Sequence, residues 1–153
     1  MVAWLVSGGQ TGVDRAALEV GRSLGIPVGG WCPAGGWAED LTEPPGLLAV
    51  FTELVETPSA DPEQRTEWNV RDSDATLVLV RRGVRSPGTA YTLGVVERLG
   101  RPSLVADVGD PGPVLTWVTG LPGDAVLNVA GPRESQAPGI HGEARALLES
   151  VLR

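Results

Sequence analysis

Residues 2–12 read VAWLVSGGQTG, a short apolar run that ends in a glycine-rich turn. The uncharged run predicts a buried strand at residues 2–6. Behind the turn, residues 14–24 place apolar side chains at helical spacing and are followed by Gly25 and Pro27, which are typical helix stop signals. A buried strand, a glycine turn and a helix in this order predict the first unit of a parallel α/β sheet.

The same alternation continues to the end of the chain. Residues 47–57 are ambiguous, and we favour a strand at 49–51; residues 33–45 are rich in glycine and proline and are expected to form a loop. Strands that are continuous apolar runs indicate a parallel sheet covered by helices on both faces. We predict strands at residues 2–6, 26–31, 49–51, 75–80, 103–106 and 125–130, and helices at 14–24, 63–72, 89–99, 114–119 and 140–152.

Length and composition predict one domain that spans residues 1–153. The longest apolar runs, 47–51 and 76–80, are far too short to cross a bilayer. The chain shows no basic start followed by an apolar stretch, so we expect no signal peptide. Its single cysteine, Cys32, cannot form an internal disulfide, and a reducing cytoplasm is the expected location.

The charge of the chain narrows the kinds of partner. A net charge of −7 argues against a general nucleic-acid-binding or membrane-binding surface. All twelve basic side chains are arginine. A local anion site would therefore use backbone N–H groups, hydroxyls and the guanidinium fork.

Ligands of parallel sheets bind beyond the carboxyl ends of the strands, and three loops there contain suitable residues. The first precedes a helix, so that its backbone N–H groups and the helix dipole suit an anion; a tight turn without a ligand is the alternative. From this loop we predict ligand contacts by Gly8, Gly9, Gln10, Thr11, Gly12 and the nearby Arg15.

The second and third loops follow the strands at 75–80 and 125–130. The hydroxyls of Ser86 and Thr89 suit either a helix cap or a phosphate. Asn128 is polar within an apolar strand and needs a hydrogen-bonding partner, which could be a loop, a strand or a ligand. The predicted contacts here are Ser86, Gly88, Thr89, Asn128, Gly131, Arg133 and Ser135.

Arg65 and Asn69 lie on one face of the predicted helix at 63–72 and are further candidates, with surface pairing as the alternative. Asp14 and Glu134 are weak candidates for a catalytic base, although Asp14 equally suits the first turn of a helix. Cys32 and His141 could form a nucleophile pair, but no surrounding motif supports it. No cluster of residues has the spacing of metal ligands.

Four segments together resemble the molybdenum-cofactor carrier family: SGGQTGVDRAA at 7–17, GGWCP at 29–33, RTEWNVRDSD at 65–74 and NVAGPRES at 128–135. This family falls within a Rossmann-like nucleotide-binding superfamily that includes LOG-type phosphoribohydrolases and DprA-like proteins. The resemblance implies a doubly wound sheet, a homodimer or homotetramer, and a pocket for a phosphorylated ligand. That ligand would be the molybdenum cofactor, a pterin with a terminal phosphate, or a nucleotide.

The sequence departs from the motif of the LOG-type enzymes at one position. Their motif is Gly-Gly-x-Gly-Thr-x-x-Glu, preceded by an arginine; Arg65, Gly88 and Thr89 match it, but the catalytic glutamate would fall at Thr92. A threonine cannot supply the carboxylate that N-glycosidic cleavage needs. We therefore favour a binding or carrier protein over the alternative, a nucleotide-processing enzyme.

Overall fold

The computed structural model describes residues 2–153, and it contains one six-stranded sheet in the order β3-β2-β1-β6-β4-β5. Every neighbouring pair of strands is parallel. The strands are β1 (Trp4–Val6), β2 (Val28–Cys32), β3 (Leu54–Glu56), β4 (Ala75–Val80), β5 (Ser103–Asp107) and β6 (Val126–Ala130). The predicted α/β class and doubly wound parallel sheet are confirmed.

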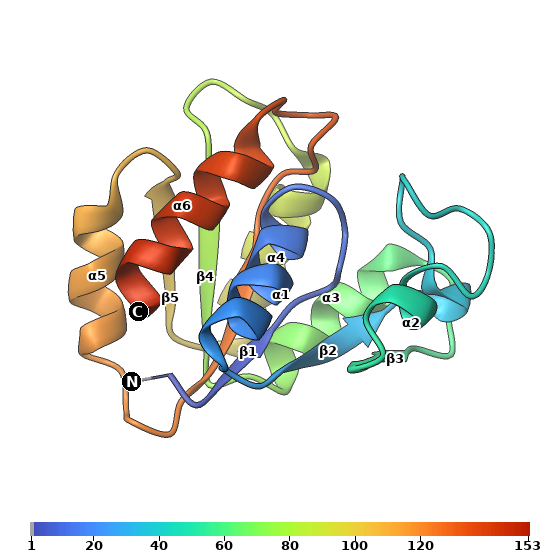
Figure 1. Cartoon of the computed structure of the whole chain (residues 1–153), viewed down its shortest axis with the longest axis horizontal. Helices are drawn as coiled ribbons and strands as arrows, with labels where there is room; N and C mark the ends of the chain where they lie inside the picture. Colours follow the sequence, from blue (N-terminus) through green and yellow to red (C-terminus); the bar gives the residue numbers. More distant parts are fainter. Residues whose placement is uncertain (1) are drawn as a thin grey trace.

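Helices cover both faces of the sheet (Figure 1). In the view of Figure 1, α1, α5 and α6 lie in front of the sheet, and α3 and α4 lie behind it. The helices are α1 (Val13–Leu24), α2 (Leu47–Val50), α3 (Pro62–Arg71), α4 (Pro87–Leu99), α5 (Pro111–Thr119) and α6 (Ile140–Leu152), with a 3-10 turn η1 at Ala34–Gly36. Among the described residues, no helix is long and apolar enough to cross a membrane.

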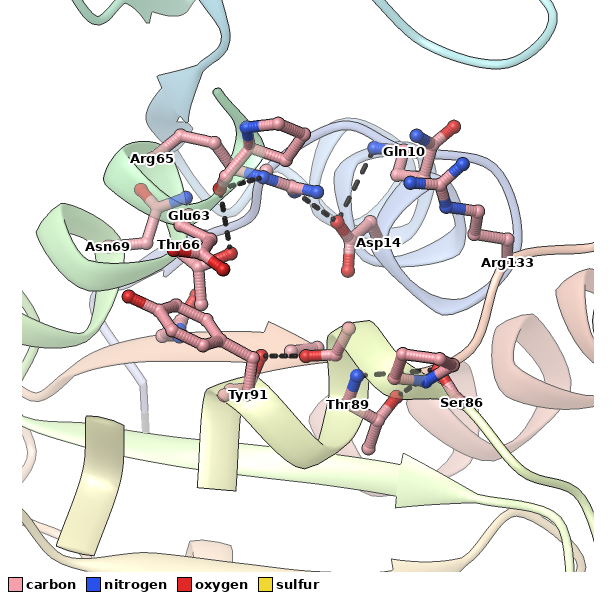
Figure 2. Close-up of a pocket in the computed structure, with 18 of the residues that line it drawn as sticks. Gln10, Asp14, Glu63, Arg65, Thr66, Asn69, Ser86, Thr89, Tyr91 and Arg133 are labelled. Atoms are coloured by element: carbon pink, nitrogen blue, oxygen red, sulfur yellow. Dashed lines mark hydrogen bonds and ion pairs between the residues drawn. The ribbon is translucent and has the colours of Figure 1, made fainter. Parts of the chain in front are cut away.

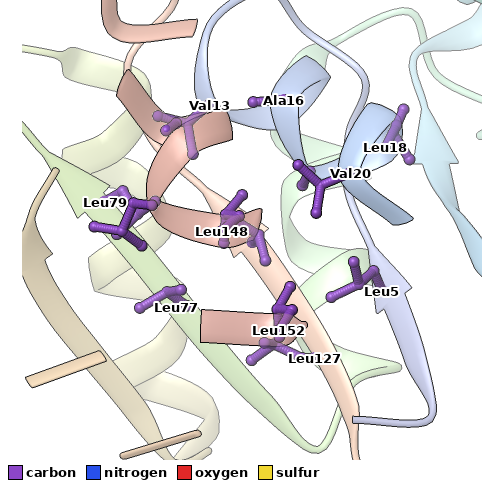
Figure 3. Close-up of a cluster of buried hydrophobic side chains, with 14 of the residues drawn as sticks. Leu5, Val13, Ala16, Leu18, Val20, Leu77, Leu79, Leu127, Leu148 and Leu152 are labelled. Atoms are coloured by element: carbon purple, nitrogen blue, oxygen red, sulfur yellow. The ribbon is translucent and has the colours of Figure 1, made fainter. Parts of the chain in front are cut away.

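The main core lies between the sheet and the helices α1 and α6 (Figure 3). Leu5, Leu77 and Leu127 come from three neighbouring strands and are fully buried. They pack against the apolar sides of α1 and α6, including Val20 and Leu148. Removing such a leucine side chain from a packed core costs about 2–5 kcal/mol, so this layer contributes strongly to the stability of the sheet.

The prediction of a strand at residues 49–51 is wrong. Residues 47–50 form the short helix α2, and the strand β3 follows at Leu54–Glu56. Leu47 and Phe51 are buried while Val50 is exposed, a spacing of four that suits a helix. A run of only five apolar residues does not distinguish the two structures by itself.

Two helices begin more than one residue earlier than the sequence predicts. The helix predicted at residues 89–99 starts at Pro87, and the one predicted at 114–119 starts at Pro111. Proline suits the first turn of a helix, because its missing N–H would have no partner there. The sequence-based prediction places both prolines in the preceding loops.

The position of β6 brings three loops together. The chain builds β1, β2 and β3 to one side, crosses over to β4 and β5, and returns to insert β6 between β1 and β4. The carboxyl ends of β1, β6 and β4 therefore lie side by side. Ligands of open α/β sheets bind at such points of reversal.

Candidate functional site

A pocket of about 410 Å³ lies where these three strands end, and we call it the central pocket (Figure 2). Many of the residues predicted from the sequence line this pocket, and they come from all three loops and from α3. These residues are Gly8, Gln10, Asp14, Arg65, Asn69, Ser86, Gly88, Thr89, Asn128, Gly131 and Arg133.

Asp14 and Arg65 form a buried ion pair in the wall of the central pocket. Arg65 Nη1 lies 3.1 Å from Asp14 Oδ2, and the two side chains are 12% and 7% exposed. The Gln10 backbone N–H also donates to Asp14 Oδ2, at 3.4 Å. Figure 2 shows the arginine reaching from α3 to the carboxylate on α1. The charge of Arg65 is thus matched by a protein carboxylate.

Burial raises the pKa of the Asp14 carboxyl above its usual value, and the ion pair with Arg65 opposes this effect only in part. A buried carboxylate loses its hydration, which favours the protonated form. Raised pKa values of carboxyls in clefts occur at functional sites, although structural ion pairs show them too. Asp14 is therefore the one predicted catalytic candidate that lines the central pocket.

Arg133 lines the central pocket, and its charge is one of the causes that lower the pKa of Glu39 in the neighbouring loop. Within residues 2–153, its side chain joins no ion pair and donates no hydrogen bond. Its guanidinium carbon lies 5.4 Å from the centre of the Trp37 ring, within the range of a cation–π contact. Trp37 thus holds the guanidinium in place while its five N–H donors stay available.

The N-terminus of α4 forms the side of the central pocket opposite Asp14 (Figure 2). Ser86 is the N-cap: its hydroxyl accepts from the Thr89 backbone N–H at 3.3 Å and donates to Gln136 Oε1 at 2.9 Å. A Cβ atom added to Gly88 would meet no atom within 4 Å, so this glycine leaves open space at the helix terminus. A helix N-terminus with free space in front of it suits an anion.

Asn69 and Asn128 are buried and line the central pocket, yet they differ in their bonds. Asn69 accepts from the Trp31 backbone N–H at 2.7 Å and donates to the Trp31 carbonyl at 3.0 Å, which ties α3 to β2. Asn128 donates to Thr76 Oγ1 at 3.3 Å, and within the described chain its Oδ1 accepts no hydrogen bond. Asn69 is satisfied by the protein, whereas Asn128 has an acceptor left.

The remaining predicted residues lie outside the central pocket. Gly9 faces Leu47 and Leu54 in the core. The others belong to a neighbouring surface, which we call the outer network, where side chains bond to one another. Its members are Thr11, Gly12, Arg15, Glu39, Asp40, Glu134 and Ser135.

The outer network is closely bonded. Arg15 makes a two-pronged ion pair with Asp40, both contacts at 2.8 Å. Glu39 accepts from the Thr11 hydroxyl at 2.9 Å and from the Ser135 hydroxyl at 2.7 Å. Burial by itself would raise the pKa of Glu39, but these hydrogen bonds outweigh it and the pKa is lowered.

Glu134, the second catalytic candidate, caps α6 instead of facing the central pocket. Its carboxylate accepts from the backbone N–H groups of Gly139 and His141, at 2.6 and 2.9 Å. Burial opposes ionisation, yet these bonds lower the pKa of Glu134. A carboxylate at a helix N-terminus is stabilised by the unpaired N–H groups there.

Cys32 and His141 do not meet. Cys32 is fully buried in β2, and burial raises the pKa of its thiol to about 11. His141 pairs instead with Glu19, at 2.6 Å. In the part of the chain that the structure describes, no three His, Cys, Asp or Glu side chains are placed to hold a metal ion.

Several lining residues were missed by sequence reasoning. Thr66 and Tyr91 come from helix faces that turn toward the central pocket, and Gln136 accepts from the Arg133 backbone N–H at 3.2 Å. Thr66 follows the predicted residue Arg65 directly in the sequence, and this neighbourhood could have pointed to it. No motif marks Tyr91 or Gln136.

Comparisons with known proteins agree on one family. A model described as "Circularly permutated YpsA SLOG family" matches residues 5–152. A solved structure described as "putative molybdenum carrier protein" from Syntrophus aciditrophicus SB is 37% identical, with a TM-score of 0.85. That match covers 99% of this chain and 96% of the other. No curated protein matches the chain.

Proposed function

Because the chain belongs to the circularly permutated YpsA SLOG family, we propose that it binds and carries a phosphorylated small molecule in the central pocket. The molybdenum cofactor and a nucleotide are the two ligand types that we consider. The relative from Syntrophus aciditrophicus, described as a putative molybdenum carrier, favours the first.

The observation that carries this proposal is the unpaired guanidinium of Arg133 beside the open N-terminus of α4. Charge-assisted hydrogen bonds from a guanidinium to a phosphate are shorter and stronger than neutral ones. The N–H of Gly88 and the dipole of α4 would add to them. Asp14 does not repel the anion strongly, because Arg65 balances its charge. Glu63, the other acidic lining residue, lies at the exposed rim.

The central pocket suits the phosphate end of the cofactor better than the metal. Among the described residues, no cysteine or histidine lines it. A bond from the protein to molybdenum therefore has no ligand atom of the soft type there. We expect recognition through the phosphate, by Arg133 and the start of α4, and through the organic part of the ligand.

The carboxyl of Asp14 in the central pocket favours a second candidate function, hydrolysis of a nucleotide derivative. Thr92 also lines the pocket, but its hydroxyl donates to the Gly88 carbonyl at 3.0 Å and it supplies no carboxylate. Asp14 supplies a carboxylate in the same space from another part of the chain. A circularly permuted chain need not carry a motif at the same place in its order, so Thr92 alone does not decide against an enzyme.

Calorimetric titration and thermal unfolding test the carrier function, with ribose 5-phosphate, AMP and molybdenum cofactor as probes. A ligand at about 100 times its Kd should stabilise the protein by about 2.7 kcal/mol. If none of the three stabilises the protein, the proposal fails. Release of free base from AMP by wild type, abolished in Asp14→Asn, would establish the enzyme instead.

We also propose that two copies associate through α4 and β5. β5 is an edge strand, and Val105 and Leu99 are 47% and 37% exposed. Gly94 lies in the middle of α4 with open space around it, which would let a second helix approach closely. Light scattering should show an oligomer of wild type and a monomer of Val105→Glu. A monomeric wild type would refute this.

A further inference from the structure

A second hollow, of about 420 Å³, lies beside the central pocket, and we call it the ring hollow. Its walls are largely apolar: Trp37, Pro44 and Pro62 supply flat surfaces, and Ala34 and Ala60 supply methyl groups. Thr42 adds a hydroxyl. Flat apolar walls with few polar groups are typical of sites for planar organic rings.

Two residues connect the ring hollow to the central pocket. Pro62, the first residue of α3, lines both. Arg133 lines the central pocket and places its guanidinium over Trp37, which lines the ring hollow. A ligand whose phosphate meets Arg133 thus has an indole next to it.

Trp37 has unused binding capacity. It is half-buried in the loop after η1, and in residues 2–153 the one close aromatic pair is Trp31 with Trp68. Across the same residues, its indole N–H donates no hydrogen bond, whereas that of Trp31 donates to Asp72 at 2.9 Å. A tryptophan that lines an open hollow and has a free N–H offers both an aromatic surface and a donor.

We propose that the ring hollow binds the planar heterocycle of the phosphorylated ligand, stacked on Trp37. This inference rests on the proposed function, because the phosphate is held in the central pocket by Arg133. The ligand class is thereby a phosphate joined to an aromatic heterocycle, such as a purine or a pterin. A sugar phosphate alone would fill only the central pocket.

The test compares the affinities of AMP and a phosphorylated pterin with that of ribose 5-phosphate. Stacking of a base on an aromatic side chain is worth about 1–3 kcal/mol, which corresponds to at least about fivefold in affinity. We expect wild type to bind one of the two ring compounds about tenfold tighter than ribose 5-phosphate. In Trp37→Leu this ratio should fall to near one.

The ratio separates stacking from any effect on Arg133, because both ligands carry the same phosphate. Trp4→Leu, which changes a 43% exposed tryptophan on β1, is the matched control and should keep the wild-type ratio. Trp37→Phe keeps a ring and should keep most of the affinity. It should also lose the quenching of indole fluorescence that ring binding causes in wild type, a readout that does not depend on Trp37→Leu folding.

Each outcome decides a different statement. An unchanged ratio in Trp37→Leu, or unchanged quenching in Trp37→Phe, would overturn the ring hollow as the heterocycle site. Equal affinities of wild type for ribose 5-phosphate and both ring compounds would do the same and leave the carrier function standing. Failure of wild type to bind any of the three compounds would overturn both proposals.

Discussion

The central pocket and the outer network draw on the same loops after β1 and β6, but they use their polar groups in opposite ways. In the outer network, the charged groups of Arg15 and Glu39 bond to protein side chains. In the central pocket, Arg133 and Asn128 keep free donors and acceptors. Because the two regions share loop positions and residue types, the hydrogen-bonding capacity that remains free is what separates a candidate binding residue from a structural one.

Arg65 shares one property with the residues of each region. It lines the central pocket like Arg133, but it is paired like Arg15. Its partner Asp14 is buried, whereas Asp40, the partner of Arg15, is 45% exposed. This difference in burial sets the sizes of the effects that follow.

The largest expected effect is on stability, in Arg65→Met. This change leaves the buried Asp14 carboxyl without its charge partner, and breaking a buried pair costs about 3–5 kcal/mol. Urea unfolding at neutral pH should show a free energy of unfolding lower by about 3 kcal/mol. Adding Asp14→Asn should recover part of the loss, since no buried charge then remains.

Arg15→Met is the control for that prediction. An ion pair with a half-exposed partner contributes at most about 1 kcal/mol, and the hydrogen bond from Arg15 Nε to the Gly9 carbonyl adds about 1 kcal/mol, so this variant should lose no more than about 2 kcal/mol. If Arg15→Met costs as much as Arg65→Met, burial does not distinguish the two pairs and our reading of the central pocket is wrong.

The second effect is on affinity, in Arg133→Met. Loss of hydrogen bonds to a charged group costs about 1.5–3 kcal/mol, which is roughly tenfold or more in Kd. Titration with AMP should show this loss, while the free energy of unfolding changes by no more than the ~1 kcal/mol of the contact with Trp37. Arg15→Met should bind as wild type does; equal losses in both variants would contradict the comparison.

The sequence predicts the architecture better than it predicts the site. The uncharged run 75–80 and the glycine-closed helices at 14–24 and 89–99 have clear patterns, and their elements are confirmed. The order of strands is not contained in such local patterns. The insertion of β6 between β1 and β4 depends on packing across the whole sheet, and this insertion is what brings the loops together.

The glycines show the limit for the site. Gly8 and Gly12 lie in the turn that we predicted to approach an anion, yet their close neighbours are protein atoms: Arg65 Nη1 for Gly8 and the Pro132 carbonyl for Gly12. A sequence shows that backbone is accessible at a glycine but not what approaches it. The sequence does not point to Trp37, which we propose as the stacking residue, because a single tryptophan in a loop has no pattern.

The third prediction uses two glycines that both line the central pocket. A Cβ atom at Gly131 would lie 2.4 Å from the Leu79 carbonyl oxygen, whereas at Gly88 it would meet nothing. Gly131→Ala should therefore cost about 1–3 kcal/mol of stability by overpacking. Gly88→Ala should change stability by less than about 1 kcal/mol, in the stabilising direction.

The readout is thermal unfolding together with AMP affinity. Gly88→Ala should weaken binding although the fold is intact, because its methyl group enters the space in front of α4. An unchanged affinity in Gly88→Ala would show that the ligand does not lie at this helix terminus.

The smallest effect concerns pH, and it separates the two regions by sign. Glu39, in the outer network, has a lowered pKa when folded, so its contribution is present above the pKa of the unfolded state and is lost as pH falls through the folded pKa. Asp14, in the central pocket, has a raised pKa when folded. Between the unfolded and the folded pKa its folded carboxyl keeps a proton that the unfolded chain has lost, so its contribution to stability falls as pH rises through this range.

The stability difference between wild type and Glu39→Gln should thus grow with pH by at most about 1 kcal/mol, whereas the difference between wild type and Asp14→Asn should shrink. Urea unfolding at a series of pH values from acid to neutral measures both differences, and two differences that change in the same direction would show that the buried and surface carboxylates are not held in opposite ways.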